Sequence, residues 1–240
     1  LRKRSIGHLA RTFLHELKED AHDMMTDQDY GDGYGGLDCK YDTEAEVEKV
    51  LRTFPDLITT PKSNLYDYPI NCLTHVIDDE DRVTCNTQAI SFIHVFARVA
   101  IEFNSFNDKE RGGLLIQVAD NDWGGSALNN VGWVVKHLLT LTSKSGSDED
   151  NQQVENICIA QLIRLRQSGL LTKQDVLDHA LCLYDDPYFP ERRFRFLTEW
   201  NPNLLLLHVD IFGNSPLGKV IKDIDHFKLV FDCCIRFYPH

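Results

Sequence analysis

Apolar residues recur every three to four positions along most of the chain, which is the spacing of amphipathic helices. The clearest such helix is predicted over residues 88–106. Its polar residues form one narrow stripe on an otherwise apolar cylinder, so we expect neighbouring elements to cover most of its surface. The polar stripe consists of Ser91, His94, Arg98, Glu102 and Ser105.

Short local signals predict where helices begin and end. Thr43 followed by Glu46 forms a capping-box pattern, and so does Thr172 followed by Asp175. Pro55 ends the helix that Thr43 begins, because proline cannot donate a helical hydrogen bond. The resulting prediction is an all-α fold with helices over residues 5–25, 44–54, 69–76, 88–106, 126–139, 154–167, 172–183, 191–200, 216 onward and 225–238.

Strand signals are poor. Residues 114–118 and 204–209 are short apolar runs that fit either a strand or the continuation of a helix. Gly169 suits the left-handed position that often follows a helix.

One segment of the chain resembles a later one at a constant spacing. Residues 55–73 align without gaps with residues 202–220, at an offset of 147. Self-similarity of this kind is typical of stacked repeats. Few paired positions are identical, so an irregular helical domain with ordinary Ser-Pro helix starts is the alternative. The aligned positions include Pro55 with Pro202, Leu57 with Leu204 and Pro69 with Pro216.

The best-formed repeat opening lies at residues 210–217. Gly213 permits a tight turn with positive φ, Ser215 accepts hydrogen bonds from the amides of a following helix, and Pro216 fits the first helical position. This opening resembles the ankyrin repeat, whose units begin with a glycine turn and Thr-Pro-Leu-His. Gly218 stands where the family has His, which removes a hydrogen bond between neighbouring turns.

Two weaker copies of this opening precede it, so helices are predicted to begin at Pro69, Ala127 and Pro216. These positions are 58 and 89 residues apart, whereas ankyrin units are regular at about 33 residues. Two phrases look like unit ends and are similar to the long, irregular ankyrin-like units of uncharacterised microalgal proteins: Phe54-Pro55-Asp56-Leu57 and Ile235-Arg236-Phe237-Tyr238-Pro239. The resemblance is specific over roughly residues 190 to 240, loose over 44 to 189 and absent before that. It implies a helical-hairpin repeat solenoid with irregular units.

In the ankyrin family the turn tips contact the target. The resemblance therefore implies binding residues at Tyr66, Asp67, Trp123, Ile211 and Phe212, which we call the turn tips. Trp123 and Phe212 both precede a turn glycine by one position. Trp and Tyr often anchor interfaces. Large aromatic rings are also mostly buried, so packing against the adjacent turn is the alternative.

The overall composition limits the class of partner. The net charge of -12 argues against nucleic acid, since phosphate contacts need clustered Lys and Arg, and it favours a protein partner with a basic patch. No membrane-spanning segment is predicted, so we expect no membrane partner. The seven scattered cysteines favour a reducing, cytoplasmic location. We divide the chain into an N-terminal helix with an acidic Gly-rich linker, residues 1–42, and a repeat domain, residues 43–240.

Candidate metal-binding patterns in the sequence are incomplete. His15 and Glu16 resemble half of a zinc-protease helix, but Glu19 stands where the second His is needed. His8, His15 and His22 recur every two helical turns, about 10.5 Å apart, which is too far for one ion. A calcium loop near Asp27 lacks the required glycine. We therefore predict no metal site.

Candidate catalytic and cofactor patterns are equally weak. Residues 31–36 match the glycine spacing of a dinucleotide site, but no strand precedes them and their surroundings are acidic. Cys233 and Cys234 are adjacent and suit packed core thiols. We therefore predict no catalytic residues and no cofactor.

These observations predict a non-enzymatic protein–protein interaction scaffold built from degenerate ankyrin-like repeats. The alternative is an all-helical enzyme or small-ligand-binding regulatory domain of unknown chemistry. A closed pocket lined by several of five polar residues would favour that alternative: His75, His94, Glu102, Asp120 and His137.

Overall fold

The fold is described from a computed structural model of the 240-residue chain. Contacts within the chain divide it into two compact units, Leu1–Gly113 and Leu114–His240. The predicted boundary at residue 42 stays a prediction. The structure describes residues 5–28, 35–62, 68–77, 83–116, 133–143, 146–179, 183, 189–206, 216–221 and 223–239.

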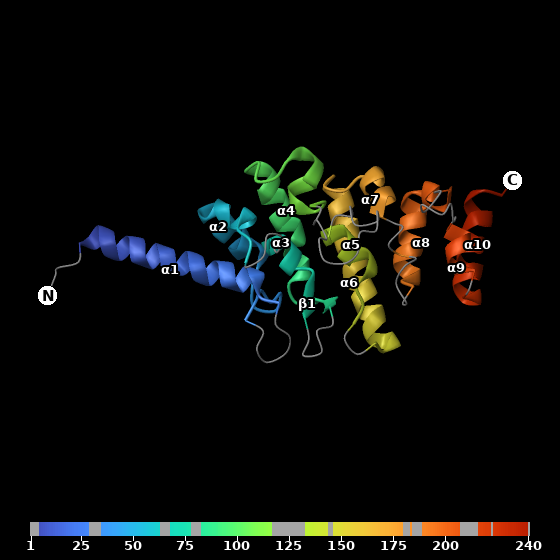
Figure 1. The fold of residues 1–240 in the computed structure, drawn as a ribbon, viewed down its shortest axis with the longest axis horizontal. Helices are drawn as coiled ribbons and strands as arrows, with labels where there is room; N and C mark the ends of the chain where they lie inside the picture. Colours follow the sequence, from blue (N-terminus) through green and yellow to red (C-terminus); the bar gives the residue numbers. More distant parts are fainter. Residues whose placement is uncertain are drawn as a thin grey trace, which may run out of the picture. The chain divides into compact units, whose positions relative to one another are not determined.

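Helices dominate the described residues of both units, which confirms the all-α prediction (Figure 1). The predicted element type is wrong for the last residues of the segment 69–76. The helix expected over residues 69–76 ends at Cys72, and an antiparallel hairpin of β1, His75–Ile77, and β2, Val83–Cys85, follows it. Most of the residues in these two strands are β-branched, and such residues favour extended backbone over helix.

The first unit is built around α4, Ile93–Glu102, which is shorter than the predicted helix over residues 88–106. Between Phe92 and Ala100, every residue except His94 and Arg98 is buried. The prediction that neighbours cover the apolar surface is confirmed up to Ala100, but beyond it the apolar Ile101 and Phe103 are exposed. The elements that contact α4 are η3, Ile90–Phe92; α2, Glu44–Thr53; η2, Pro55–Thr59; α3, Pro69–Cys72; and η4, Asp108–Gly113.

The predicted capping box at the start of α2 is confirmed. The Glu46 amide donates to Thr43 Oγ1 at 3.3 Å, and the Thr43 amide donates to Glu46 Oε2 at 3.0 Å. The other helix of this unit is α1, Ile6–Thr26, of which only the C-terminal end is buried. That end contacts α3.

The second unit contains six α-helices and one 3-10 helix within its described residues. The α6 helix begins at Asp148, six residues before the predicted start, because Ser147 accepts a hydrogen bond from Asp150 and caps it. Gly169 has a φ of +74° and ends α6, as predicted. The elements are α5, Trp133–Thr140; α6, Asp148–Gln167; α7, Lys173–His179; α8, Glu191–Trp200; η6, Pro202–Leu206; α9, Pro216–Val220; and α10, Ile224–Phe237.

The capping box before α7 is also confirmed, because the Thr172 amide donates to Asp175 Oδ2 at 2.7 Å and the Asp175 amide donates to Thr172 Oγ1 at 3.3 Å. The apolar run 204–209 is helical over its described part, since η6 reaches Leu206.

The offset of 147 residues that relates two parts of the sequence also relates the bounds of their elements. Adding 147 to the bounds of α2, Glu44–Thr53, gives the bounds of α8, Glu191–Trp200. In the same way η2, Pro55–Thr59, becomes η6, Pro202–Leu206, and the first residue of α3 becomes the first residue of α9. The coincidence thus extends over three consecutive elements.

Backbone hydrogen bonds follow the same offset. Phe54 donates to Val50 O at 2.9 Å, and Asn201 donates to Leu197 O at 2.7 Å. Contacts between elements correspond as well. The α4 helix contacts α2, η2 and α3, while α10 contacts α8, η6 and α9. In Figure 1, α2 lies beside α4 and α8 lies beside α10.

Three helices end in the same way, at a residue that precedes proline. Phe54 follows α2 with φ −128° and ψ 67°, Asn201 follows α8 with φ −140° and ψ 89°, and Tyr238 follows α10 with φ −136° and ψ 72°. Proline excludes the helical conformation from the residue before it. The X-Pro dipeptide therefore sets where each of these helices stops.

Candidate functional site

The five predicted turn tips, Tyr66, Asp67, Trp123, Ile211 and Phe212, lie outside the described residues. The structure does describe the helices that follow two of the three turns. The α3 helix begins at Pro69 and α9 begins at Pro216, as the sequence predicts. The third predicted start, at Ala127, lies outside the described residues.

The helix that follows the first turn is firmly packed. All four residues of α3 are buried. Tyr68, which directly precedes α3, packs edge-on against Phe106 with 5.6 Å between ring centroids.

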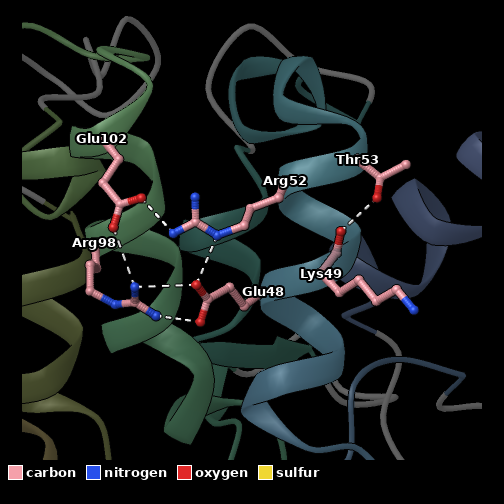
Figure 2. Close-up of polar contacts among 6 residues, drawn as sticks. All are labelled: Glu48, Lys49, Arg52, Thr53, Arg98 and Glu102. Atoms are coloured by element: carbon pink, nitrogen blue, oxygen red, sulfur yellow. Dashed lines mark hydrogen bonds and ion pairs between the residues drawn. The ribbon is translucent and has the colours of Figure 1, made fainter.

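Four charged side chains form a cluster across α2 and α4, which we call the α2–α4 charge cluster (Figure 2). Arg98 Nη2 lies 2.6 Å from Glu48 Oε2, and Arg52 Nε lies 2.8 Å from Glu48 Oε1. Arg52 Nη2 also lies 2.5 Å from Glu102 Oε2, and Arg98 Nη1 lies 3.3 Å from Glu102 Oε1. Each cation thus contacts both anions.

The electrostatics of this cluster fit a structural contact better than proton transfer. Hydrogen bonds from Arg98 and Arg52 lower the pKa of Glu48 to about 2. Hydrogen bonds from Glu48 in turn raise the pKa values of both arginines. A carboxylate that stays ionised throughout the neutral range is a poor general acid or base. The cluster therefore joins two helices and supplies no titrating group.

The second unit has a related ion pair with its charges exchanged. Glu199, in α8, is the residue at an offset of 147 from Arg52. Its Oε1 lies 3.1 Å from Nη1 of Arg236, in the last turn of α10. In the first unit Arg52 pairs with Glu102, in the last turn of α4. Neither contact could be predicted from the sequence, because each joins helices far apart in the chain.

A groove of about 510 Å³ lies between α1 and η2 and is open to solvent. Its lining includes two of the three histidines that recur along α1, His15 and His22. His15 Nε2 lies 3.4 Å from Glu19, and His22 Nε2 lies 2.9 Å from the Thr60 carbonyl oxygen. Among the described residues, no three His, Cys, Asp or Glu side chains are arranged to hold a metal ion.

The polar residues named for the alternative enzymatic function do not line this groove, as far as the structure describes them. His75 is buried beside β2, where desolvation lowers its pKa to about 4. Glu102 belongs to the α2–α4 charge cluster, and Asp120 lies outside the described residues. His137 is buried in α5, in the other unit.

The adjacent cysteines of α10 have the properties of packed thiols. Burial raises the pKa values of both Cys233 and Cys234, which disfavours the reactive thiolate. Six of the seven cysteines lie in the described part of the chain, and each of the six is a thiol rather than half of a disulfide. None of the described helices combines the length and the apolar character that crossing a membrane requires.

Comparison with known proteins returned no match to a family model, to a curated protein or to a solved structure. The resemblance to ankyrin repeats therefore rests on the residues of this chain.

Proposed function

We propose that this chain is a non-enzymatic protein–protein interaction scaffold with an irregular, ankyrin-like arrangement of helical repeats. The observation that carries the proposal is the agreement between sequence and structure at one offset. The spacing of 147 residues relates the bounds of α2 and α8, of η2 and η6, and the starts of α3 and α9. Repeated units of this kind stack and present their connecting turns along one edge.

The pattern of contacts supports the same proposal. In both segments the last helix contacts the first helix, the 3-10 helix and the proline-started helix. A charged pair joins the first and last helices in both, although the charges are exchanged. The two segments keep an ion pair between the first and last helices with the acidic and basic residues exchanged. This fits two copies of one unit that have diverged.

The binding surface in this proposal is the set of turn tips. Trp123 and Phe212 occupy the same position before the turn glycine and are the proposed aromatic anchors. The partner is a protein with a basic patch, because the net charge of -12 steers such a partner toward the chain. Nucleic acid and membrane surfaces are not partners in this proposal, and the protein acts in a reducing, cytoplasmic environment.

The experiment is affinity capture with the full chain, followed by measured binding to the purified partner. Trp123→Ala and Phe212→Ala should each weaken binding by about 10- to 100-fold, the loss typical of an aromatic hot spot. Tyr41→Ala is the matched control, because Tyr41 is an exposed aromatic residue outside the three predicted repeat turns. Binding should also weaken as salt is added.

Two results would count against the proposal. One is equal affinity of the tip variants and the Tyr41→Ala control for the captured partner. The other is binding that does not change with salt concentration, since the proposed partner is basic and the chain is acidic.

A further inference from the structure

The charges that α2 contributes to the α2–α4 charge cluster are exchanged in α8. Glu48 and Arg52 carry these charges in α2 (Figure 2). Adding 147 to their numbers gives Arg195 and Glu199 in α8. In both helices the residue one position earlier is buried, so the charged positions have equivalent surroundings: Val47, Leu51, Phe194 and Thr198.

A second offset, of 134 residues, relates α4 to α10. The three buried residues of α10 follow three buried residues of α4 at this offset: Leu229 follows Val95, Val230 follows Phe96, and Cys233 follows Val99. Asp232 stands at the same offset from Arg98, and Arg236 from Glu102. The exchange of charge thus extends to all four positions of the cluster.

The four charged residues of the second unit are called here the α8–α10 charge set: Arg195, Glu199, Asp232 and Arg236. The Oε1 atom of Glu199 lies 3.1 Å from Nη1 of Arg236, as Arg52 contacts Glu102 in the first unit. Arg195 donates to Glu191 of its own helix at 2.8 Å. Burial raises the pKa of the Cys233 thiol, and the charges of Arg195, Arg236 and Asp232 also act on it. The set therefore surrounds the contact between α8 and α10.

These charges are too exposed to contribute much stability. The side chains of Glu199 and Arg236 are 55% and 64% exposed, and exposed ion pairs contribute little to folding. Complementary charges contribute more to the choice of a partner than to the strength of binding. Their arrangement is therefore better explained by which helices pair than by how stably they pair.

The apolar contacts alone would not distinguish the two helix pairs. The α4 helix contacts α2, the α10 helix contacts α8, and both present buried residues at the same spacing. Apolar burial is non-directional, and cores tolerate the exchange of one hydrophobic side chain for another. Chains that contain related segments are prone to misassembly and to domain swapping between copies. A chain with this arrangement needs a further signal that matches each helix with its own partner.

The exchanged charges supply such a signal. If α10 packed on α2 in place of α4, Asp232 would lie against Glu48, and Arg236 would lie against Arg52. Like charges that face each other disfavour a wrong partner. The same conflict would arise if α4 packed on α8: Arg98 would lie against Arg195, and Glu102 against Glu199.

We infer that these exchanged charges determine helix pairing as the chain folds. They match α4 with α2 and α10 with α8, and they disfavour both crossed pairings, within one chain and between two copies. The inference rests on the correspondence between segments that the proposed function also uses. It does not depend on the turn tips or on a partner.

The first test inverts the charges of one helix at a time. The α8 inversion is Arg195→Glu with Glu199→Arg, and the α10 inversion is Asp232→Arg with Arg236→Glu. Each inversion alone should lower the equilibrium constant for folding by about 10-fold, because it brings like charges together. Both inversions together should recover most of that loss, since opposite charges face each other again. Urea denaturation of the parent and the three variants measures this coupling. If an inverted helix prevents folding, Glu199→Arg, Arg236→Glu and their combination provide the same comparison.

The second test asks whether pairing becomes ambiguous when both helices are inverted. This variant keeps opposite charges in both native helix pairs, but the two pairs now carry their charges in the same order. Crossed pairings are then no longer disfavoured by charge. After refolding from urea at about 100 µM, a concentration at which misassembly competes with folding, the share of soluble dimers should exceed that of the parent by about 3-fold or more. Size-exclusion chromatography measures this share. The dimers should keep the helical content of the monomer by circular dichroism, because swapping exchanges equivalent elements.

The matched control exchanges a charged pair of α10 outside the set, Asp225→Lys with Lys228→Asp. Both side chains are exposed, and the exchange keeps the net charge, so the control should refold like the parent. Three results would overturn the inference. They are additive effects of the α8 and α10 inversions, a doubly inverted variant with no more dimer than the parent, or an equal excess of dimer in the control. No partner protein is present in either test, so these failures would not bear on binding by the turn tips.

Discussion

At the scale of single residues, Gly112 fixes the turn after α4. Its φ is +66°, and a Cβ atom there would lie 2.3 Å from the carbonyl oxygen of Ala97, which is buried in α4. The sequence shows the Gly112-Gly113 pair but not this close approach, which depends on where η4 packs against α4.

Gly112→Ala should therefore destabilise the protein by about 2 to 4 kcal/mol, since it adds a steric clash to backbone strain. Gly146→Ala is the matched control, because Gly146 has a φ of +65° but no atom near its Cβ position. The control should lose only about 1 kcal/mol. Urea denaturation of both variants checks the difference, and equal losses would show that the close approach is not tight in solution.

His75 should make stability depend on pH. Burial lowers its pKa from 6.5 to about 4, and Gln28 Nε2 lies 2.7 Å from its Nε2. Because the folded pKa is below the unfolded one, the folded state binds the proton less readily. Stability is therefore fully present above pH 6.5 and falls as pH drops toward 4, by roughly 3 kcal/mol in total.

His75→Gln should flatten this dependence relative to the parent chain. The measurement is the free energy of unfolding at several pH values between 4 and 7. Carboxylates contribute to the slope in both proteins, so the difference between the two curves isolates His75. Parallel curves for the two proteins would contradict the burial of a neutral imidazole.

At the scale of elements, Arg193 joins three helices of the second unit. This α8 residue is fully buried, and its guanidinium donates to the carbonyl oxygens of Leu138 and Leu141, at the end of α5, at 3.2 and 2.9 Å. Its Nε lies 3.8 Å from Glu155 of α6. Burial raises the pKa of Glu155, although Arg193 acts in the opposite direction.

Arg193→Leu should cost about 3 to 5 kcal/mol, because it leaves a buried carboxyl without its nearest buried cation and two carbonyl oxygens without their guanidinium donor. Adding Glu155→Leu should recover part of the loss, since it removes the carboxyl that lost this cation. Chemical denaturation of the single and double variants provides the test. If Arg193→Leu alone is as stable as the parent, then Arg193 does not stabilise the packing of these helices.

The sequence could predict those features that are stabilised by residues close together in the chain. Both capping boxes, the Gly169 helix end and the proline starts of α3 and α9 depend on residues within one helical turn, and the structure contains all of them. The hairpin of β1 and β2 could not be predicted as easily, because its strands stabilise each other across an intervening segment. The α2–α4 charge cluster joins residues about 50 positions apart and gave no local signal.

At the scale of the whole molecule, the offset of 147 residues relates more elements of the structure than any motif in the sequence does. The alignment of residues 55–73 with 202–220 rests on few identities, yet both bounds of α2 and α8, which precede the aligned segments, and of η2 and η6, which lie within them, follow the same offset. Apolar spacing and proline positions determine where helices begin and end. Helix bounds therefore persist while the other side chains diverge. The predicted turn tips lie outside the described residues and stay predictions.

The most direct test of the central claim, that the turns bind a protein partner, is hydrogen exchange of the full chain with and without the captured partner. We predict slower exchange in the partner complex at residues 63–68, 121–126 and 209–215. Exchange should be unchanged at the helix ends before Pro55, Pro202 and Pro239. Protection confined to these helix ends, or to α1 and α10, with none at the three turns, would contradict the account.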